Sequence, residues 1–280
     1  MPTIGRHNTL TVVKQVDFGQ YLDGGDMGEI LLPKRYVPEG LKPGEEVRVF
    51  LYNDSEDRII ATTESPRAVV GECACLRVVE VNNIGAFLDW GLPKDLLLPF
   101  NEQETRRVEV GEQVVVYIYL DENTNRVAAS AKLSDFLHET SSAFQFREAV
   151  DVMIAKRTPL GYKAIINGAY LGVIYAQEVP LKLKTGQKIK GFMKQPRDDG
   201  RLDVSVTLLS NAARDDLASQ IIAHLEASGG SSPLSDKSPP EQIYQQFKVS
   251  KKAFKHAIGG LYREKRITLS PQGIKLNQEE

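Results

Sequence analysis

Apolar and polar positions alternate in short runs through residues 73–132, and turn-forming residues interrupt these runs at regular intervals. The interruptions are Asn82-Asn83, Gly85, Gly91-Leu92-Pro93, Gly111-Glu112 and Asn123-Thr124-Asn125. Alternation with a period of two predicts β-strands, and the spacing leaves room for about five of them without a crossover helix. Five strands within roughly 60 residues indicate a small closed barrel.

The first 65 residues repeat this pattern at an offset of 66 to 68 residues. Corresponding pairs are Gly19 and Gly85, Pro33 and Pro99, Gly44 and Gly111, and Arg58 and Arg126. A third, more divergent copy places Gly161, Tyr175, Gly186 and Arg201 at the same landmarks. Recurrence at a fixed spacing indicates three tandem copies of one unit. Between the second and third copies, residues 133–149 are expected to form a partly helical connector.

The apolar period changes to that of a helix from Asn211 to Ala227. A second helix is predicted from Pro239-Pro240 to Phe247, and Ser250 is a favourable N-cap for a third that continues to Lys265. Residues 266–276 predict a β-hairpin with its turn at Ser270-Pro271-Gln272-Gly273. Helix, turn, helix and hairpin form a winged helix, in which the segment from Ser250 takes the recognition-helix position.

The order of landmarks in the repeated unit is more specific than its strand pattern. A Gly-Ala-Phe-Leu turn, the strand Leu96-Leu97-Leu98-Pro99, a Gly-Glu-x-Val corner and an Asn-Arg-Val turn follow one another. This order resembles the S1-type RNA-binding domain, a five-stranded OB-fold barrel. The chain is therefore expected to be mainly β with a small α/β module, with three tandem S1-type barrels before a winged-helix domain. The expected boundaries are 1–65, 66–135 and 150–209 for the barrels, 210–235 for a helix and linker, and 236–280 for the winged helix.

The S1 resemblance implies a set of RNA-binding residues. In such domains aromatic side chains stack on bases, and an arginine before the last strand holds a phosphate. The residues implied here are Phe18, Tyr21, Arg58, Phe87, Arg126, Tyr162, Lys163, Tyr175 and Arg201. Tyr175 takes the place of a histidine common in the family, where the first two copies have Pro33 and Pro99. The alternative is that Tyr21 and Phe87 belong to the barrel cores and that the arginines are ordinary surface residues of turns.

The net charge of −2 conceals a polarity along the chain. Residues 1–65 and 66–151 carry net charges of −4 and −6, whereas 152–206 contain ten basic and four acidic residues. The segment from Lys248 to Arg266 contains seven basic residues and one acidic residue. Local positive surface favours contact with nucleic acid, although a solvated helix face remains the alternative. The expected winged-helix contacts are Lys248, Lys251, Lys252, Lys255 and Arg263.

Longer motifs extend the resemblance over nearly the whole chain. They read LGYKAIIN from residue 160, DKSPPEQI from residue 236 and FKVSKKAFK from residue 247, followed by Ile258-Gly259 and Leu261-Tyr262. Together they resemble the CvfB/YitL family of bacterial RNA-binding proteins. The resemblance implies post-transcriptional regulation, with effects on virulence-factor expression in some bacteria. The residues by themselves indicate only nucleic-acid binding.

The sequence offers no catalytic or metal-binding motif. Its four histidines lie far apart, and it has no Walker A run, no Gly-x-Gly-x-x-Gly and no metal-ligand spacing, so neither enzymatic activity nor a cofactor is expected. Cys73 and Cys75 are expected to be reduced thiols. No apolar run approaches the ~20 residues of a membrane span, so a cytoplasmic protein without membrane association is expected.

Single-stranded RNA is the expected partner, and two other kinds of partner fit the same sequence. One alternative is a DNA-binding transcription regulator that uses the winged helix, with the barrels as sensor or dimerisation modules. The other is a ribosome-associated protein that interacts with a ribosomal or protein partner.

Overall fold

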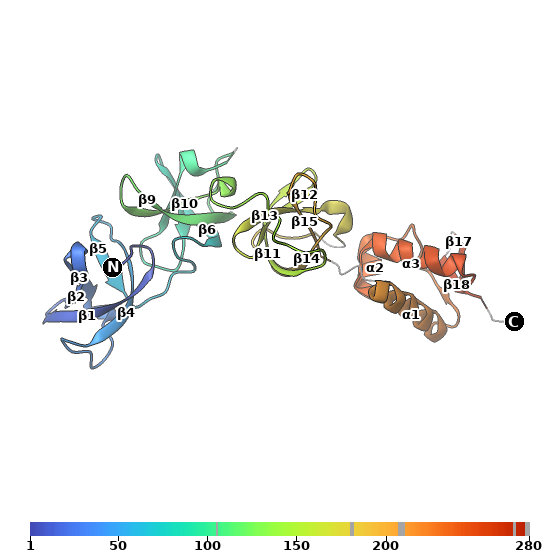
Figure 1. Ribbon diagram of the computed structural model, residues 1–280, viewed down its shortest axis with the longest axis horizontal. Coiled ribbons are helices and arrows are strands. Elements are labelled where there is room, and N and C mark those ends of the chain that lie inside the picture. Colours follow the sequence, from blue (N-terminus) through green and yellow to red (C-terminus); the bar gives the residue numbers. More distant parts are fainter. Residues whose placement is uncertain (105, 180–181, 207–210, 271–272, 278–280) are drawn as a thin grey trace. The chain divides into compact units, whose positions relative to one another are not determined.

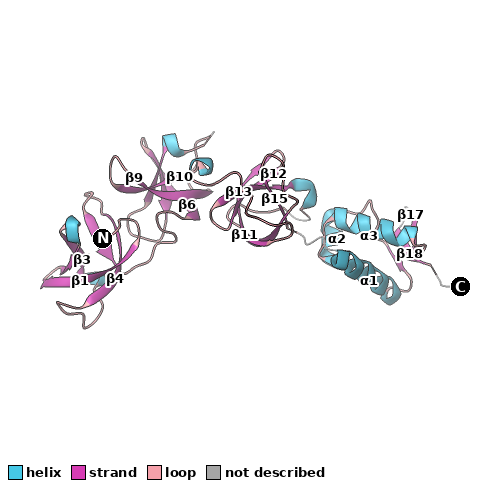
Figure 2. Cartoon of the chain, viewed as in Figure 1, coloured by secondary structure: helices cyan, strands magenta, loops and turns pink. Residues whose placement is uncertain are grey.

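The computed structural model describes the chain except residues 105, 180–181, 207–210, 271–272 and 278–280 (Figure 1). It divides into two compact units, Met1–Leu137 and His138–Glu280. Figure 2 shows that strands build most of the chain and that the long helices lie in its C-terminal part. The two central residues of the predicted hairpin turn, Pro271-Gln272, lie outside the described residues.

Three modules of five strands follow one another. The first contains β1 (His7–Val16), β2 (Gly19–Asp23), β3 (Glu29–Pro33), β4 (Glu46–Asn53) and β5 (Ile59–Thr62). The second contains β6 (Cys73–Val81), β7 (Gly85–Asp89), β8 (Leu96–Pro99), β9 (Gln113–Asp121) and β10 (Arg126–Ser130). The third contains β11 (Ala149–Thr158), β12 (Gly161–Ile166), β13 (Tyr170–Tyr175), β14 (Lys188–Met193) and β15 (Leu202–Ser205).

The three modules share one strand order, as the internal repeat predicts. The first and third are closed barrels, in which the parallel pairs β3–β5 and β13–β15 complete the ring. The second has the equivalent order β10-β9-β6-β7-β8, but its described residues form no backbone ladder between β8 and β10. It is therefore a partly open barrel of the OB type. The first strand of each module has an irregular register at the same point, at Val12/Lys14, Val78/Glu80 and Ile154/Lys156, and such bulges bend a strand around a small barrel.

The first two barrels share a hydrophobic contact within their unit. Phe50 and Tyr52 of β4 are buried in the same cluster as Trp90, which follows β7 of the second barrel. Trp90 is 2 % exposed, and its ring lies edge-on to Phe50 with centroids 5.7 Å apart. Its indole N–H donates to the carbonyl of Lys94 at 2.6 Å, so the polar atom of this buried ring is satisfied.

The connector after the second barrel forms a 3₁₀ turn at Leu133–Asp135, in agreement with the partly helical expectation. Phe136 then stacks on Tyr117 with ring centroids 4.5 Å apart. None of the helices within the described residues has the length and apolar character needed to span a membrane.

The C-terminal domain contains α1 (Asn211–Ala227), β16 (Ser231–Ser232), α2 (Pro240–Phe247), α3 (Lys251–Arg263), β17 (Ile267–Ser270) and β18 (Gly273–Leu276). The predicted bounds of α1 are confirmed. The Ser250 hydroxyl accepts a hydrogen bond from the Ala253 amide at 3.2 Å, which is the predicted N-cap of α3.

The structure draws the boundary of this domain differently from the sequence analysis. Leu217, Ile221 and Leu225 of α1 are buried in one cluster with Phe254 of α3, and β16 pairs with β18. The segment expected to be a separate helix and linker therefore contributes α1 to the winged-helix core and β16 to its sheet. The apolar stripe of α1 is buried here against the other helices, as an amphipathic helix requires.

Candidate nucleic-acid interface

Each barrel turns sharply between its first two strands at a glycine. Gly19, Gly85 and Gly161 each begin the second strand, and an added Cβ would lie 2.1 to 2.4 Å from a carbonyl oxygen of the facing strand. No other residue fits at this distance without moving the backbone. The residue before each glycine is a large apolar one that points to solvent; Phe18, Ile84 and Leu160 are 58 %, 54 % and 67 % exposed.

The position two residues after each glycine faces outward from the barrel. Tyr21 and Phe87 are half-buried and lie outside the hydrophobic clusters of the barrel cores. The alternative that they are core residues is therefore not supported. Tyr21 makes an edge contact with Phe18, with ring centroids 6.3 Å apart, and Lys163 takes the same position in the third barrel.

Tyr162 does not lie where a nucleic-acid contact requires. It is 5 % exposed and belongs to the core of the third barrel, where its hydroxyl accepts a hydrogen bond from the Leu183 amide at 3.2 Å. The expectation that Tyr162 binds RNA is therefore wrong. Neighbouring residues of a strand point to opposite faces, so an outward Lys163 places Tyr162 inside.

The strand pairing confirms that Pro33, Pro99 and Tyr175 are equivalent, because each faces the glycine that begins the second strand. Tyr175 is held in a polar network on the third barrel. Its hydroxyl lies 3.3 Å from a carboxylate oxygen of Asp203, and the Lys194 ammonium lies 4.9 Å from the centre of its ring. A partly exposed ring with a cation beside it suits base stacking.

A left-handed residue precedes the recurring arginine in every barrel. Asp57, Asn125 and Gly200 have φ values of 64°, 56° and 72° and lie immediately before Arg58, Arg126 and Arg201. Asp, Asn and Gly are the residues that tolerate this backbone conformation. The common turn places the three arginines equivalently, with Arg126 already the first residue of β10.

The three arginines differ in their partners. Arg58 pairs with Asp54 at 2.8 Å and with Glu56 at 2.9 Å. Burial raises the pKa of Asp54, but the hydrogen bonds from Arg58 outweigh it and hold that pKa below its ordinary value. Arg126 pairs with Asp57 of the first barrel. Arg201 forms no ion pair with any residue that the structure describes.

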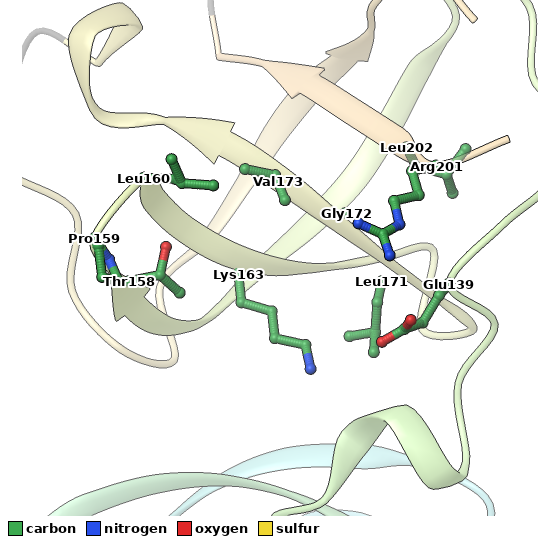
Figure 3. A pocket seen from close by; sticks show the side chains of 10 residues that line it. All are labelled: Glu139, Thr158, Pro159, Leu160, Lys163, Leu171, Gly172, Val173, Arg201 and Leu202. Atoms are coloured by element: carbon green, nitrogen blue, oxygen red, sulfur yellow. The ribbon is translucent and has the colours of Figure 1, made fainter. Parts of the chain in front are cut away.

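Arg201 borders a groove of about 470 Å³ on the third barrel. Figure 3 shows the amine of Lys163 and the guanidinium of Arg201 on the same side of the strands. Leu160 and Val173 add apolar surface to the groove, and Glu139 adds one carboxylate. The face of the second and third strands is the one that OB folds use to bind single-stranded nucleic acid.

The corresponding face of the second barrel is partly covered by the first barrel. A pocket of about 350 Å³ there is lined by Phe87, Pro99 and Arg126 and also by Tyr52 and Asp57 of the first barrel. Burial raises the pKa of Tyr52 to about 12, so its hydroxyl stays neutral at physiological pH. An intramolecular carboxylate thus lies where the second barrel would receive a phosphate.

The winged helix carries the other predicted contacts. Lys248, Lys252, Lys255 and Arg263 are exposed, and Lys251 is half-exposed. Lys252 lies 3.5 Å from Glu178 and Lys255 lies 3.9 Å from Asp236, distances typical of weak, screened pairs.

Three exposed side chains beside these contacts were not predicted. Ile84 and Leu160 directly precede the recurring turn glycines of the repeat, so comparison of the internal copies could have identified this position. Tyr262, which is 54 % exposed on α3, had no comparable sequence signal.

Comparisons with known proteins agree with this architecture. Residues 4–64 and 70–131 match the S1 domain, and residues 219–276 match the CvfB-like winged helix domain, whose match begins within α1. The chain is 28 % identical to YitL of Bacillus subtilis, over 94 % of this chain and 90 % of that protein. It is 27 % identical to conserved virulence factor B of Staphylococcus saprophyticus, over 85 % and 82 %. The chain is a homologue of YitL and conserved virulence factor B.

A solved multidomain protein with nucleic acid binding domains from Streptococcus pneumoniae is 24 % identical, with a TM-score of 0.46 over 98 % of each chain. The S1 and CvfB-like winged helix domains are nucleic-acid-binding types rather than catalytic ones. Within the described part of the chain, no group of three or more His, Cys, Asp and Glu side chains is arranged to hold a metal ion.

Proposed function

We propose that the protein binds single-stranded RNA through the third barrel and the CvfB-like winged helix domain, and that it acts in the cytoplasm as a post-transcriptional regulator. The difference among three equivalent arginines carries the proposal. Arg58 and Arg126 are paired with carboxylates, whereas Arg201 lines the same groove as Lys163 and has no ion-pair partner among the described residues. Of the three, Arg201 alone has no described carboxylate within ion-pair distance, although its charge interacts with Asp199 at longer range.

Charge and domain type support the same assignment. Residues 152–206 contain ten basic and four acidic residues, which favours a polyanion on the third barrel. The preference for RNA rests on the CvfB/YitL resemblance and on the S1 domain type, which the first two barrels match and whose strand order the third barrel shares. Tyr175 and Leu160 supply surfaces on which bases can stack or pack.

The test compares two arginine variants of the full chain. Arg201→Ala is expected to weaken binding of a labelled oligouridylate about tenfold, because a charge-assisted hydrogen bond is lost. The slope of log affinity against log salt should fall by about 0.7, the value for one phosphate on a single strand. Arg58→Ala is the matched control, since this arginine is already paired, and it should leave both quantities unchanged. Equal effects of the two variants would contradict the proposal.

One observation favours a second candidate. Helix α3 occupies the recognition-helix position, which in winged helices commonly enters the major groove of DNA. Tighter binding of duplex DNA than of single-stranded RNA at matched salt would favour a transcription regulator. Ribosome association would instead be favoured if RNA capture disappears in extract depleted of ribosomes.

A further inference from the structure

The exposed face of α3 has a gap at its centre. Ala253, Phe254 and Leu261 form the buried side of the helix, and Gly259 lies nearly opposite them at 100° per residue. Lys252 and Lys255 lie two turns and one turn before Gly259 on this face. Tyr262 and Arg263 lie one turn after it.

Nothing within the described chain explains a glycine at this position. A Cβ added to Gly259 would meet no described atom within 4 Å, so the residue is not required for packing. Its conformation is ordinary right-handed helix, so no positive φ requires glycine either. Glycine in a helix interior is less stable than alanine, which makes the position unfavourable for the isolated domain.

The gap leaves the backbone of α3 open to an external partner. Arg263 reaches back over it, and its Nε donates to the carbonyl of Gly259 at 3.2 Å. Lys252 and Lys255 precede the gap on the same face, and their side chains are 62 % and 66 % exposed. Their ammonium groups lie 3.5 Å from Glu178 and 3.9 Å from Asp236, distances of weak, screened pairs. Lys252, Lys255, Gly259 and Arg263 follow one another at steps of three or four residues, so the three basic residues lie on the same helix face as the glycine.

We infer that Gly259 is a close-approach point at which an RNA phosphodiester lies against the helix backbone, between Lys252, Lys255 and Arg263. The adjoining base stacks on Tyr262, whose ring is 54 % exposed. The inference rests on the proposed function for its choice of RNA, and it adds Gly259 and Tyr262 to the interface. Cations on both sides and no side chain between them fit a flexible, negatively charged backbone.

The experiment uses the full chain and two neighbouring glycines. Gly259→Ala should raise the unfolding temperature of the winged-helix transition by a few degrees and weaken binding of a labelled oligouridylate about fivefold. Gly259→Gln should weaken binding about twentyfold, because its longer side chain fills the gap. Gly260→Ala is the matched control. An added Cβ there also meets no described atom within 4 Å, but Gly260 lies about 100° around the helix from Gly259.

We expect Gly259→Ala and Gly260→Ala both to be stabilised. We expect only Gly259→Ala and Gly259→Gln to lose affinity. Unchanged affinity in both Gly259 variants would overturn the inference. If the Gly259 variants bind normally but the double variant Lys252→Ala, Lys255→Ala binds more weakly, the proposed function stands without the inference about Gly259. Loss of duplex-DNA binding with intact oligouridylate binding in the Gly259 variants would also overturn it, because the occupant would then be a duplex. Tyr262→Ala should reduce oligouridylate affinity about tenfold, and Tyr262→Leu should not restore it.

Discussion

At the residue scale, one inward-facing position serves the same purpose in two barrels with different chemistry. Gln20 in the first barrel donates from its side-chain amide to the carbonyl of Leu41 at 2.8 Å. Tyr162 is its equivalent in the third barrel and accepts from the Leu183 amide. Each buried polar group therefore anchors the loop that leads from the third strand to the fourth. Ala86 at this position of the second barrel has no such group, and Gln103 within the loop bonds to Leu98 and Val108 instead.

The two half-buried thiols give a prediction at the same scale. Burial raises the pKa of Cys73 to about 12 and also raises that of Cys75. Only about one Cys73 in 10⁴ is then a thiolate at pH 8, and the thiolate is the reactive form. Native protein should react with iodoacetamide far more slowly than protein in denaturant, as followed by mass spectrometry. Comparable rates in the two states would show that the thiols are not shielded.

The raised pKa of Cys73 also has a consequence for stability. A folded-state pKa above the unfolded value contributes stability that is fully present below about pH 9 and is lost as the pH rises toward 12. Cys73→Ser should therefore lessen the loss of stability as the pH rises above about 9.

At the element scale, the β4–β5 turn of the first barrel governs the second barrel's arginine. Asp57 pairs with Arg126 and lies 3.5 Å from the Lys94 ammonium, so one carboxylate interacts with two cations of the second barrel. Both partners of the Arg126 pair are about half exposed, and exposed pairs contribute little to stability. The effect of this carboxylate is therefore on the charge of the surface.

Asp57→Asn tests that role with the turn preserved, because Asn also tolerates a positive φ and is the native residue at the equivalent position 125. Release of Arg126 should strengthen oligouridylate binding about threefold and steepen its salt dependence by about 0.7. Fluorescence anisotropy across a salt series measures both quantities. Glu56→Gln is the control, since Glu56 pairs with Arg58 and with no other residue that the structure describes. An unchanged affinity and slope would show that the second barrel does not contact RNA even when Arg126 is free.

The elements also show what the sequence predicts and what it leaves open. Turn residues recur at fixed offsets, so the strand modules, the bounds of α1 and the Ser250 cap were predictable from local signals. The membership of α1 in the winged helix was not predictable, because an amphipathic stripe does not show which surface it packs against. The Arg126–Asp57 pair joins residues 69 positions apart, and no local pattern encodes it. Tyr162 was misplaced because a shift of one residue along a strand reverses the face.

At the scale of the whole molecule, the two compact units carry opposite charge. Residues 1–137 contain 14 basic and 22 acidic residues, and residues 138–280 contain 21 basic and 15 acidic ones. A polyanion is attracted to the second unit and repelled by the first, and salt screens both effects. The acidic unit therefore suits selectivity or protein contact better than RNA affinity.

This division predicts the behaviour of the separated units. Residues 138–280 should retain oligouridylate affinity within about tenfold of the full chain, because they hold Arg201, Lys163 and α3. Residues 1–137 should bind weakly at physiological salt. Circular dichroism confirms folding of each unit, and anisotropy measures binding. Stronger binding by residues 1–137 than by 138–280 would contradict the assignment of the interface.

The fluorescence of Trp90 reports on the contact between the first two barrels. It is the only tryptophan in the sequence, and it lies buried against Phe50 and Tyr52 where the first two barrels meet. Excitation at the red edge of protein absorbance therefore samples that junction alone. A ligand that separates the first two barrels would shift the emission to longer wavelengths, whereas one that leaves their contact intact would not.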